Sequence, residues 1–222
     1  MVHNIITYIN NLFCIGGVFM FVYIEGMDLS GKTTLASNLS NNLSGEWTVQ
    51  SNALTRDNQV WLLAEAARKN QSLDEDIIGY LYSIAMMVDV RNFNLTNYNN
   101  LIQDSTVAIR SLAYHSILGT PTVLEQLKAS VSKIPAPDMT FYLLADMKTR
   151  VARLRQREVD NPEEVAQDDL MVINNPRRFV RMERMLFEFT TEYFRPIIID
   201  TSSMTKDDVC ALALDKIRRI RR

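Results

Sequence analysis

The sequence predicts a three-layer α/β/α fold built around a five-stranded parallel sheet. Short apolar runs alternate with longer stretches of helical periodicity, which is typical of a parallel sheet covered by helices on both faces. A glycine-rich loop follows the first apolar run and precedes the first helical stretch, where α/β proteins often bind phosphate groups. The 222 residues suit one such domain with a lid or insertion.

The first strand is predicted at 19–24, and the loop after it fits the phosphate-loop pattern G-x-x-x-x-G-K-[ST]. Glycines at both ends allow successive backbone N–H groups to face phosphate oxygens, and a helix predicted at 31–43 adds the positive end of its dipole. Lys32 has the reach to contact the β- and γ-phosphates, and the Thr33 hydroxyl is a ligand for Mg²⁺. The residues predicted to bind the nucleotide here are Gly26, Ser30, Gly31, Lys32, Thr33 and Thr34.

The other elements follow from the same alternation of patterns. The remaining strands are predicted at 47–51, 99–104, 139–144 and 196–200. Helices are predicted at 58–69, 74–92, 107–118, 121–132, 147–158, 163–173 and 177–194, with a last helix after Thr205. The acidic stretch 159–169 lies among arginines, which favours a mobile lid over about 150–175 rather than a domain boundary. One domain is expected over 19–222, with 1–18 as an N-terminal extension.

Composition excludes several other classes of protein. A formal charge of −2 argues against nucleic acid as a partner. The two cysteines are far apart and indicate neither a disulfide framework nor a metal site, which suits the cytoplasm. The apolar run 12–24 is shorter than the roughly 20 residues of a membrane-spanning helix, so no membrane segment is expected.

Arginine dominates the positive charge, with 17 of the 24 basic residues. Eight arginines fall between residues 150 and 184, within the predicted lid and in the helix that follows it: Arg150, Arg153, Arg155, Arg157, Arg177, Arg178, Arg181 and Arg184. Their planar guanidinium groups suit bidentate contacts with phosphate, but acidic residues lie among them. The cluster therefore predicts either a phosphate clamp or salt-bridged helices, and different members can serve each purpose.

The phosphate loop alone does not separate kinases from GTPases and other nucleotide-dependent switches. The stretch Thr205-Lys-Asp-Asp208 matches the guanine-reading pattern [NT]-K-x-D by letters. A helix cap with Thr205 at its first position explains the same residues without guanine. A switch ATPase or GTPase stays as the least favoured hypothesis.

The extended loop Ile24-Glu-Gly-Met-Asp-Leu-Ser-Gly-Lys-Thr-Thr34 resembles the opening of thymidylate kinases, roughly [FI]-E-G-x-D-x-x-G-K-[ST]-T. The stretch from Asp104 to Tyr114 resembles that family's Asp-Arg-Tyr followed by Ser-x-x-Ala-Tyr, and looser matches span most of 19–222. The resemblance implies a P-loop kinase domain with an arginine-rich lid. It also implies transfer of phosphate from ATP, with Mg²⁺, to a nucleoside monophosphate such as dTMP, and a possible homodimer.

The resemblance also implies roles for individual residues. The expected catalytic residues are Lys32, Asp28 and the lid arginines Arg153 and Arg157. Mg²⁺ would be held by Thr33 and Asp104, and Thr201 lies in a segment resembling the loop that borders adenine. The acceptor nucleotide would be bound by Arg56, Arg91, Arg110, Ser111 and Tyr114.

Two departures from the family pattern leave the acceptor open. Ser105 stands where the family has the arginine that contacts the acceptor phosphate, and Leu29 occupies a position that is often glycine or basic. Two arginines are candidates to supply the missing charge: Arg110, about one helical turn before Tyr114, and Arg91 on the preceding helix. The alternative is a kinase of the same fold that phosphorylates a nucleoside or another hydroxyl compound, with a carboxylate as the base.

Overall fold

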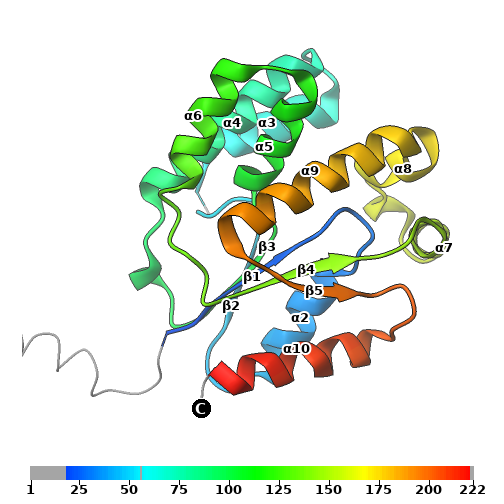
Figure 1. Ribbon diagram of the computed structural model, residues 1–222. Helices are drawn as coiled ribbons and strands as arrows, with labels where there is room; N and C mark the ends of the chain where they lie inside the picture. Colours follow the sequence, from blue (N-terminus) through cyan, green and yellow to red (C-terminus); the bar gives the residue numbers. More distant parts are fainter. Residues whose placement is uncertain (1–18, 56, 221–222) are drawn as a thin grey trace, which may run out of the picture.

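The computed structural model describes residues 19–55 and 57–220. Within these residues one sheet contains five parallel strands in the order β2-β3-β1-β4-β5. The strands are β1 (Phe21–Glu25), β2 (Thr48–Ser51), β3 (Leu101–Asp104), β4 (Met139–Leu144) and β5 (Ile197–Asp200). Helices cover both faces of this sheet (Figure 1), so the predicted three-layer α/β/α fold is confirmed.

Side chains alternate between the two faces of the sheet and build two separate cores. Val22 and Ile24 of β1 pack toward α2 (Lys32–Asn42) and α10 (Lys206–Ile220). Tyr23 points to the opposite face, where the core includes residues of α5 (Val107–Leu118) and α9 (Pro176–Phe194). All five residues of β1 are buried, as expected for a central strand of a sheet that is covered twice.

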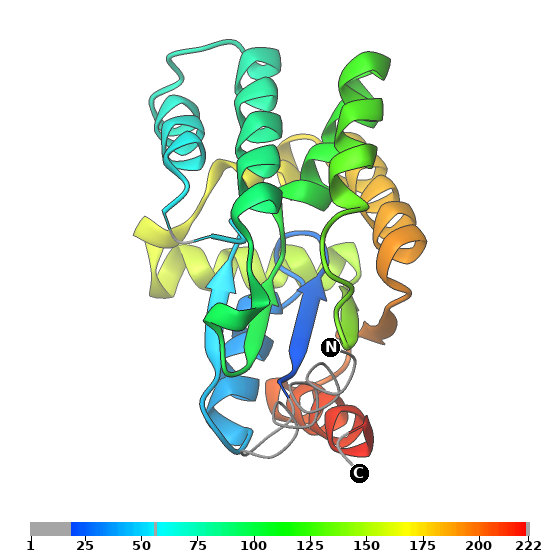
Figure 2. The ribbon, with the colours of Figure 1, turned by 90° about the vertical axis from the view of Figure 1, so that its left-hand side faces the viewer.

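The remaining helices lie on the same side of the sheet as α5 and α9 or, in the lid, beyond the carboxyl ends of the strands (Figures 1 and 2). They are α3 (Gln59–Asn70), α4 (Glu75–Asn92), α6 (Pro121–Val131), α7 (Met147–Asp160) and α8 (Gln167–Asn174). Short polar side chains begin several of them: Asn58 accepts a hydrogen bond from Trp61 N, and Thr106 accepts one from Ile109 N. The strand and helix bounds agree with the sequence prediction to within two residues, except at the lid.

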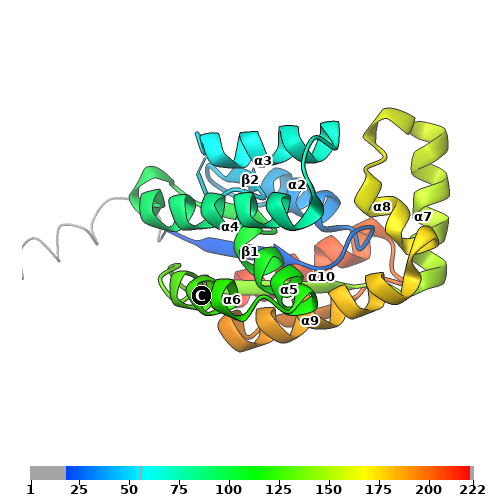
Figure 3. The ribbon, with the colours of Figure 1, turned by 90° about the horizontal axis from the view of Figure 1, so that it is seen from above.

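The lid differs from the helix predicted at 163–173. A short 3₁₀ turn (Pro162–Glu164) comes first, and Val165 and Ala166 are extended before α8 begins at Gln167. The Asp169 carboxylate accepts a hydrogen bond from Ala166 N at 3.1 Å, so it caps a new helix instead of continuing an old one. The prediction of one helix was therefore wrong in its first turn. Helices α7 and α8 lie together at one end of the molecule (Figure 3).

The order of the strands places a ligand site at the carboxyl end of β1. From β1 the chain goes to the edge strand β2, returns to β3 beside β1, and then crosses to β4 and β5 on the other side of β1. Ligands of open α/β sheets bind at such a change of direction, outside the carboxyl ends of the strands. Ile24 of β1 pairs with Asp104 of β3, so the loops after both strands meet at the same edge.

The predicted N-terminal extension, 1–18, and Arg56 lie outside the described residues. Across 19–55 and 57–220, no helix combines the length and the apolar character that crossing a membrane requires.

Candidate active site

The phosphate loop joins β1 to α2 and has a backbone that only glycine can adopt at its first position. Gly26 has a φ of 150°, and a Cβ built there would lie 2.4 Å from the Leu143 carbonyl oxygen and 2.8 Å from Ser30 Oγ. Gly31 has a φ of 99° and caps α2. The two glycines of the sequence motif therefore stand where the chain conformation requires them.

Lys32 begins α2 and its ammonium group lies over the loop. Nζ donates to Met27 O at 3.3 Å and lies 3.9 Å from Asp28 Oδ1. Burial and the nearby Arg110 guanidinium lower the pKa of Lys32 below its ordinary value, although the carboxylates of Asp28, Asp104 and Glu25 oppose the shift. A bound polyphosphate would supply the further negative charge that this partly compensated cation lacks.

Thr33 and Asp104 form an oxygen-rich pair beside the loop. Thr33 Oγ1 donates to Asp104 Oδ2 at 2.7 Å. Asp104 Oδ1 is buried and has no hydrogen-bond partner among the residues that the structure describes. A hydroxyl and a carboxylate with spare lone pairs are the ligands that Mg²⁺ prefers, so the predicted metal ligands fit this ion.

Asp28, Glu25 and Arg110 form a charged cluster below the loop. Arg110 lies 3.3 Å from Asp28 Oδ1 and 3.7 Å from Glu25 Oε1, and it donates to Gly26 O at 3.0 Å. Burial alone would raise the pKa of Asp28, but Arg110 and Lys32 outweigh it and hold that pKa below its usual value. Asp28 is therefore an anion at neutral pH, and Arg110 is held against the phosphate loop at the edge of the cleft described below.

A cleft of about 600 Å³ opens above this cluster, between the loop and helices α3, α4, α5 and α8. The predicted residues Ser111 and Tyr114 line it together with Asp28, Lys32, Thr33, Asp104 and Arg110. The sequence did not single out Trp61, Glu65, Arg68, Tyr82 or Asp168, which line it as well. Arg91 is exposed near the end of α4 and is not among the lining residues.

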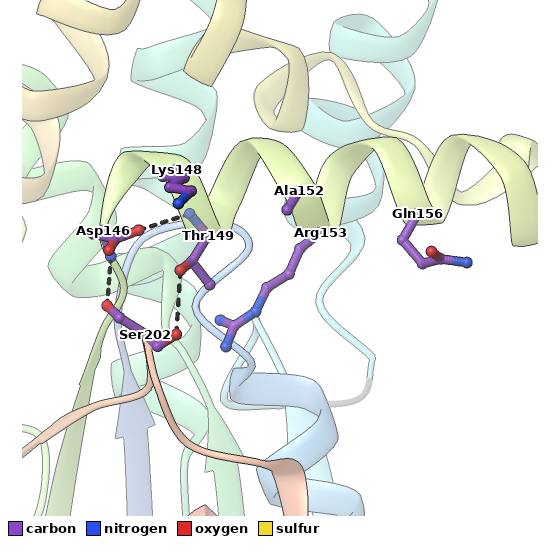
Figure 4. A pocket seen from close by; sticks show the side chains of 7 residues that line it. All are labelled: Asp146, Lys148, Thr149, Ala152, Arg153, Gln156 and Ser202. Carbon is purple, nitrogen blue, oxygen red and sulfur yellow. Dashed lines mark hydrogen bonds between the residues drawn. The ribbon is translucent and has the colours of Figure 1, made fainter.

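A second pocket of about 550 Å³ lies on the other side of the loop, between α7 and the segment after β5. Figure 4 shows Arg153 extending from α7 toward this segment. Its guanidinium donates to Leu29 O at 2.9 Å and to Thr201 O at 2.9 Å. Thr201 Oγ1 lies 3.0 Å from Ser30 O, so Thr201 and Arg153 both brace the phosphate loop. Thr34 is exposed in the first turn of α2.

Two further lid arginines are engaged with carboxylates. Arg157 lies 2.8 Å from the buried carboxylate of Asp169 and does not line the cleft in this conformation. Arg150 is fully buried, forms an ion pair with Glu183 and donates to Asp28 O, so it holds the loop from beneath. Of the two hypotheses for the arginine cluster, salt bridging describes both of these residues.

Arg150 and Glu25 are the structural supports that sequence reasoning missed. Arg150 lies one turn before the buried Leu154 on α7, so helical periodicity could have placed it on the inner face. Glu25 stands inside the quoted motif, where its carboxylate accepts hydrogen bonds from Gly26 N at 3.0 Å and from the Tyr23 hydroxyl. Nothing in the sequence motif indicated that the Glu25 side chain would be buried.

Comparison with known proteins points in one direction. The family model for thymidylate kinase matches residues 24–206. A protein from Metallosphaera sedula, described as a "probable thymidylate kinase", is 31% identical over 136 residues, which are 61% of this chain and 66% of that protein. One with the same description from Methanocaldococcus jannaschii is 22% identical over 86% of this chain and 91% of its own length.

Solved structures share the fold at lower sequence identity. A thymidylate kinase from Candida albicans superposes with a TM-score of 0.62 and 19% identity, covering 93% of this chain and 94% of its own. A deoxyadenosine kinase from M. mycoides gives a TM-score of 0.61 and 16% identity, covering 90% of this chain and 100% of its own. Both neighbours support the α/β architecture described above.

Proposed function

The chain belongs to the thymidylate kinase family, and from this premise we propose that it transfers the γ-phosphoryl group of ATP to dTMP. The observation that carries the proposal is the meeting of two phosphate-binding groups at one cleft. Lys32 of the phosphate loop and Arg110 of α5 both line the cleft, and their charged groups lie 3.9 Å and 3.3 Å from the same oxygen, Asp28 Oδ1. A donor triphosphate and an acceptor monophosphate would thus be drawn toward the same point.

The donor side is formed by the loop backbone, Lys32 and the start of α2. These groups would hold the ATP phosphates, with adenine in the pocket beside Arg153 and Thr201. Mg²⁺, held by Thr33 and Asp104, would neutralise negative charge on the β- and γ-phosphates. Arg153 is anchored next to the loop, whereas Arg157 can reach a donor phosphate only if its ion pair with Asp169 opens.

On the acceptor side, Arg110 would bind the dTMP phosphate, with Ser111 and Tyr114 along the wall of the cleft. An oxygen of that phosphate attacks the γ-phosphorus, the bond to the β-bridging oxygen breaks, and ADP and dTDP result. Arg91 has no place in this arrangement because it lies outside the cleft. Asp28 orients both cations and needs no proton, because a monophosphate oxygen is already nucleophilic at neutral pH.

These residues provide no strong base for the phosphorylation of a hydroxyl group. Phosphorylation of a hydroxyl requires a carboxylate to accept its proton. Asp28 is a weak base because its pKa lies below the ordinary value, and Asp104 already accepts a hydrogen bond from Thr33. The geometry therefore favours a nucleoside monophosphate over a nucleoside.

An acceptor panel tests the proposal directly. ADP release is measured with ATP and Mg²⁺ in the presence of dTMP, dUMP, dCMP, dAMP, thymidine or no acceptor. Release that depends on dTMP, and not on thymidine, is expected. Release that depends on thymidine but not on dTMP overturns the proposal in favour of a nucleoside kinase, and slow release indifferent to every acceptor overturns it in favour of a switch.

A further inference from the structure

Gly79 lies inside helix α4, where glycine is unfavourable and therefore needs a physical explanation. It is the fifth residue of the helix, and no left-handed φ requires glycine there. Glycine is the poorest helix former after proline, so alanine would serve the helix itself better. Gly79 lines the large cleft together with Tyr114 of α5.

The reason lies in the Tyr114 ring. A Cβ built on Gly79 would lie 2.6 Å from Tyr114 Cε1, a distance that real Cβ atoms do not show, and 3.1 Å from Cδ1, which is tighter than most Cβ contacts. The ring therefore rests directly on the backbone of α4, and any larger residue at position 79 must move it.

His115 limits where the Tyr114 ring can move, because the His115 ring contacts it and is itself held by hydrogen bonds. The His115 ring packs edge-on against Tyr114, with the ring centroids 5.6 Å apart. Its Nε2 donates to Gly79 O at 3.2 Å and lies 2.9 Å from Ser83 Oγ, and its Nδ1 lies 2.7 Å from Thr120 Oγ1. These contacts also tie α5 to α4, so the helices cannot separate without breaking them.

From this geometry we propose that Gly79 is a positioning residue that sets the width of the acceptor site. It does so by allowing the Cδ1–Cε1 edge of the Tyr114 ring to lie against the α4 backbone, out of the space that the acceptor needs. The inference rests on the proposed function, because it identifies the cleft beside Tyr114 as the acceptor site. It predicts that a single methyl group at position 79 narrows that site without touching the phosphate loop.

Gly79→Ala tests the proposal because it should change the KM for the acceptor but not the KM for ATP. The acceptor KM is expected to rise about tenfold, as for one misplaced methyl group in a binding pocket. The KM for ATP should stay unchanged and the Tm should not fall, because alanine favours the helix. Loss of structure, by contrast, would affect both KM values and the Tm. An unchanged acceptor KM overturns the proposal.

The same substitution in a Tyr114→Ala background is the matched control. With the ring absent, Gly79→Ala should add nothing to the acceptor KM, whereas independent effects would add. Full additivity overturns the role of Tyr114 as the group that Gly79 positions.

A crystal structure of the Gly79→Ala protein gives a readout that does not depend on activity. The Tyr114 ring is expected to be displaced toward the cleft, and a ring in its present position overturns the inference. If wild-type protein fails to use dTMP, the proposed function fails, while this structure still decides whether Gly79 positions Tyr114.

Discussion

Lys32 is the residue whose contribution to rate follows most directly from its surroundings. Its ammonium group is nearly buried, lies 3.9 Å from Asp28, and faces the cleft at the base of the phosphate loop. In phosphoryl transfer, fixed positive charge near the moving phosphoryl group lowers the barrier without any chemistry of its own.

Lys32→Ala should therefore reduce kcat/KM for ATP by roughly a hundredfold or more, which corresponds to about 3 kcal/mol of transition-state stabilisation. Steady-state ADP release with dTMP measures it. Lys133→Ala, an exposed lysine away from the cleft, is the matched control and should keep the wild-type rate. A nearly wild-type rate for Lys32→Ala would remove the loop from the mechanism.

Arg110 supplies a positive charge near the cleft, whereas position 105, which is an arginine in the family pattern, is a serine in this chain. Asp28 and Glu25 fix Arg110 from two directions, and the Gly26 carbonyl accepts a third contact. Arg110→Gln should mainly raise the acceptor KM, since the guanidinium would bind the acceptor phosphate, and should change the ATP KM much less. Initial rates over a matrix of both substrates separate the two constants, and an unchanged acceptor KM contradicts the role.

The same variant should move the acid limb of the pH profile. Arg110 and Lys32 hold the native pKa of Asp28 below its ordinary value, despite the opposing effect of burial. The anion of Asp28 therefore stabilises the native site at neutral pH, and this contribution is lost as pH falls through the native pKa. Without Arg110 that pKa rises, so kcat/KM should begin to fall at a higher pH than in wild type. Profiles recorded between about pH 4 and pH 8 compare the two proteins.

The roles of single residues could be predicted from the sequence where the backbone conformation determines them. Gly26 and Gly31 follow from the loop conformation, and Thr33 and Asp104 follow from the strand ends that bring them together. Arg91, Arg153 and Arg157 were harder, because the sequence shows an arginine but not the partner that binds it. Only the packed helices decide that Arg157 meets Asp169 rather than the cleft.

Among the elements, the sheet and most helices were predictable because their patterns are local. Strand β1 is buried throughout and nonpolar or aromatic up to Glu25, and Thr106 and Gly119 mark the two ends of α5. The lid was not predictable in the same way. At its break, Asp169 accepts a hydrogen bond from Ala166 N and also pairs with Arg157 of α7. The contact with Arg157 is tertiary, so the local pattern of acidic residues does not reveal it.

The break in the lid also directs two neighbouring carboxylates to different partners. Asp169 holds Arg157 within the lid, and Asp168 lies 3.2 Å from Arg68 of α3 on the opposite wall of the cleft. Arg68 is itself bound by Glu65 and Tyr82. The Asp168–Arg68 ion pair therefore links α8 to α3 across the cleft, and we expect it to favour the closed lid.

Asp168→Asn should weaken closure and lower kcat/KM for the acceptor by up to about fivefold, because partly exposed ion pairs contribute about 1 kcal/mol or less. Closure excludes water, so ADP release without acceptor should rise relative to transfer. Asp215→Asn, which removes an exposed ion pair with Arg219 on α10, is the control and should leave both rates unchanged. Equal rates for Asp168→Asn and wild type would show that this contact does not hold the lid.

For the molecule as a whole, Arg150 joins parts that are distant in the sequence. From the first turn of the lid helix α7, it donates to Ala145 O at 2.8 Å after β4 and to Asp28 O in the phosphate loop. It also pairs with Glu183 of α9, and its guanidinium lies 5.1 Å from the centre of the Phe179 ring. The lid, the loop and the α9 layer are thus connected through one buried cation.

Arg150→Met keeps the apolar stem of the side chain but leaves the largely buried Glu183 carboxylate without its cation. Removal of one partner from a buried ion pair costs roughly 3–5 kcal/mol, which in a protein of this size lowers the Tm by on the order of 10 °C. The exposed Arg155→Met on the same helix is the matched control and should melt with wild type. Adding Glu183→Gln to Arg150→Met should recover part of the loss, since no uncompensated charge then remains buried. A Tm equal to wild type for Arg150→Met would show that neutral packing alone joins these three segments.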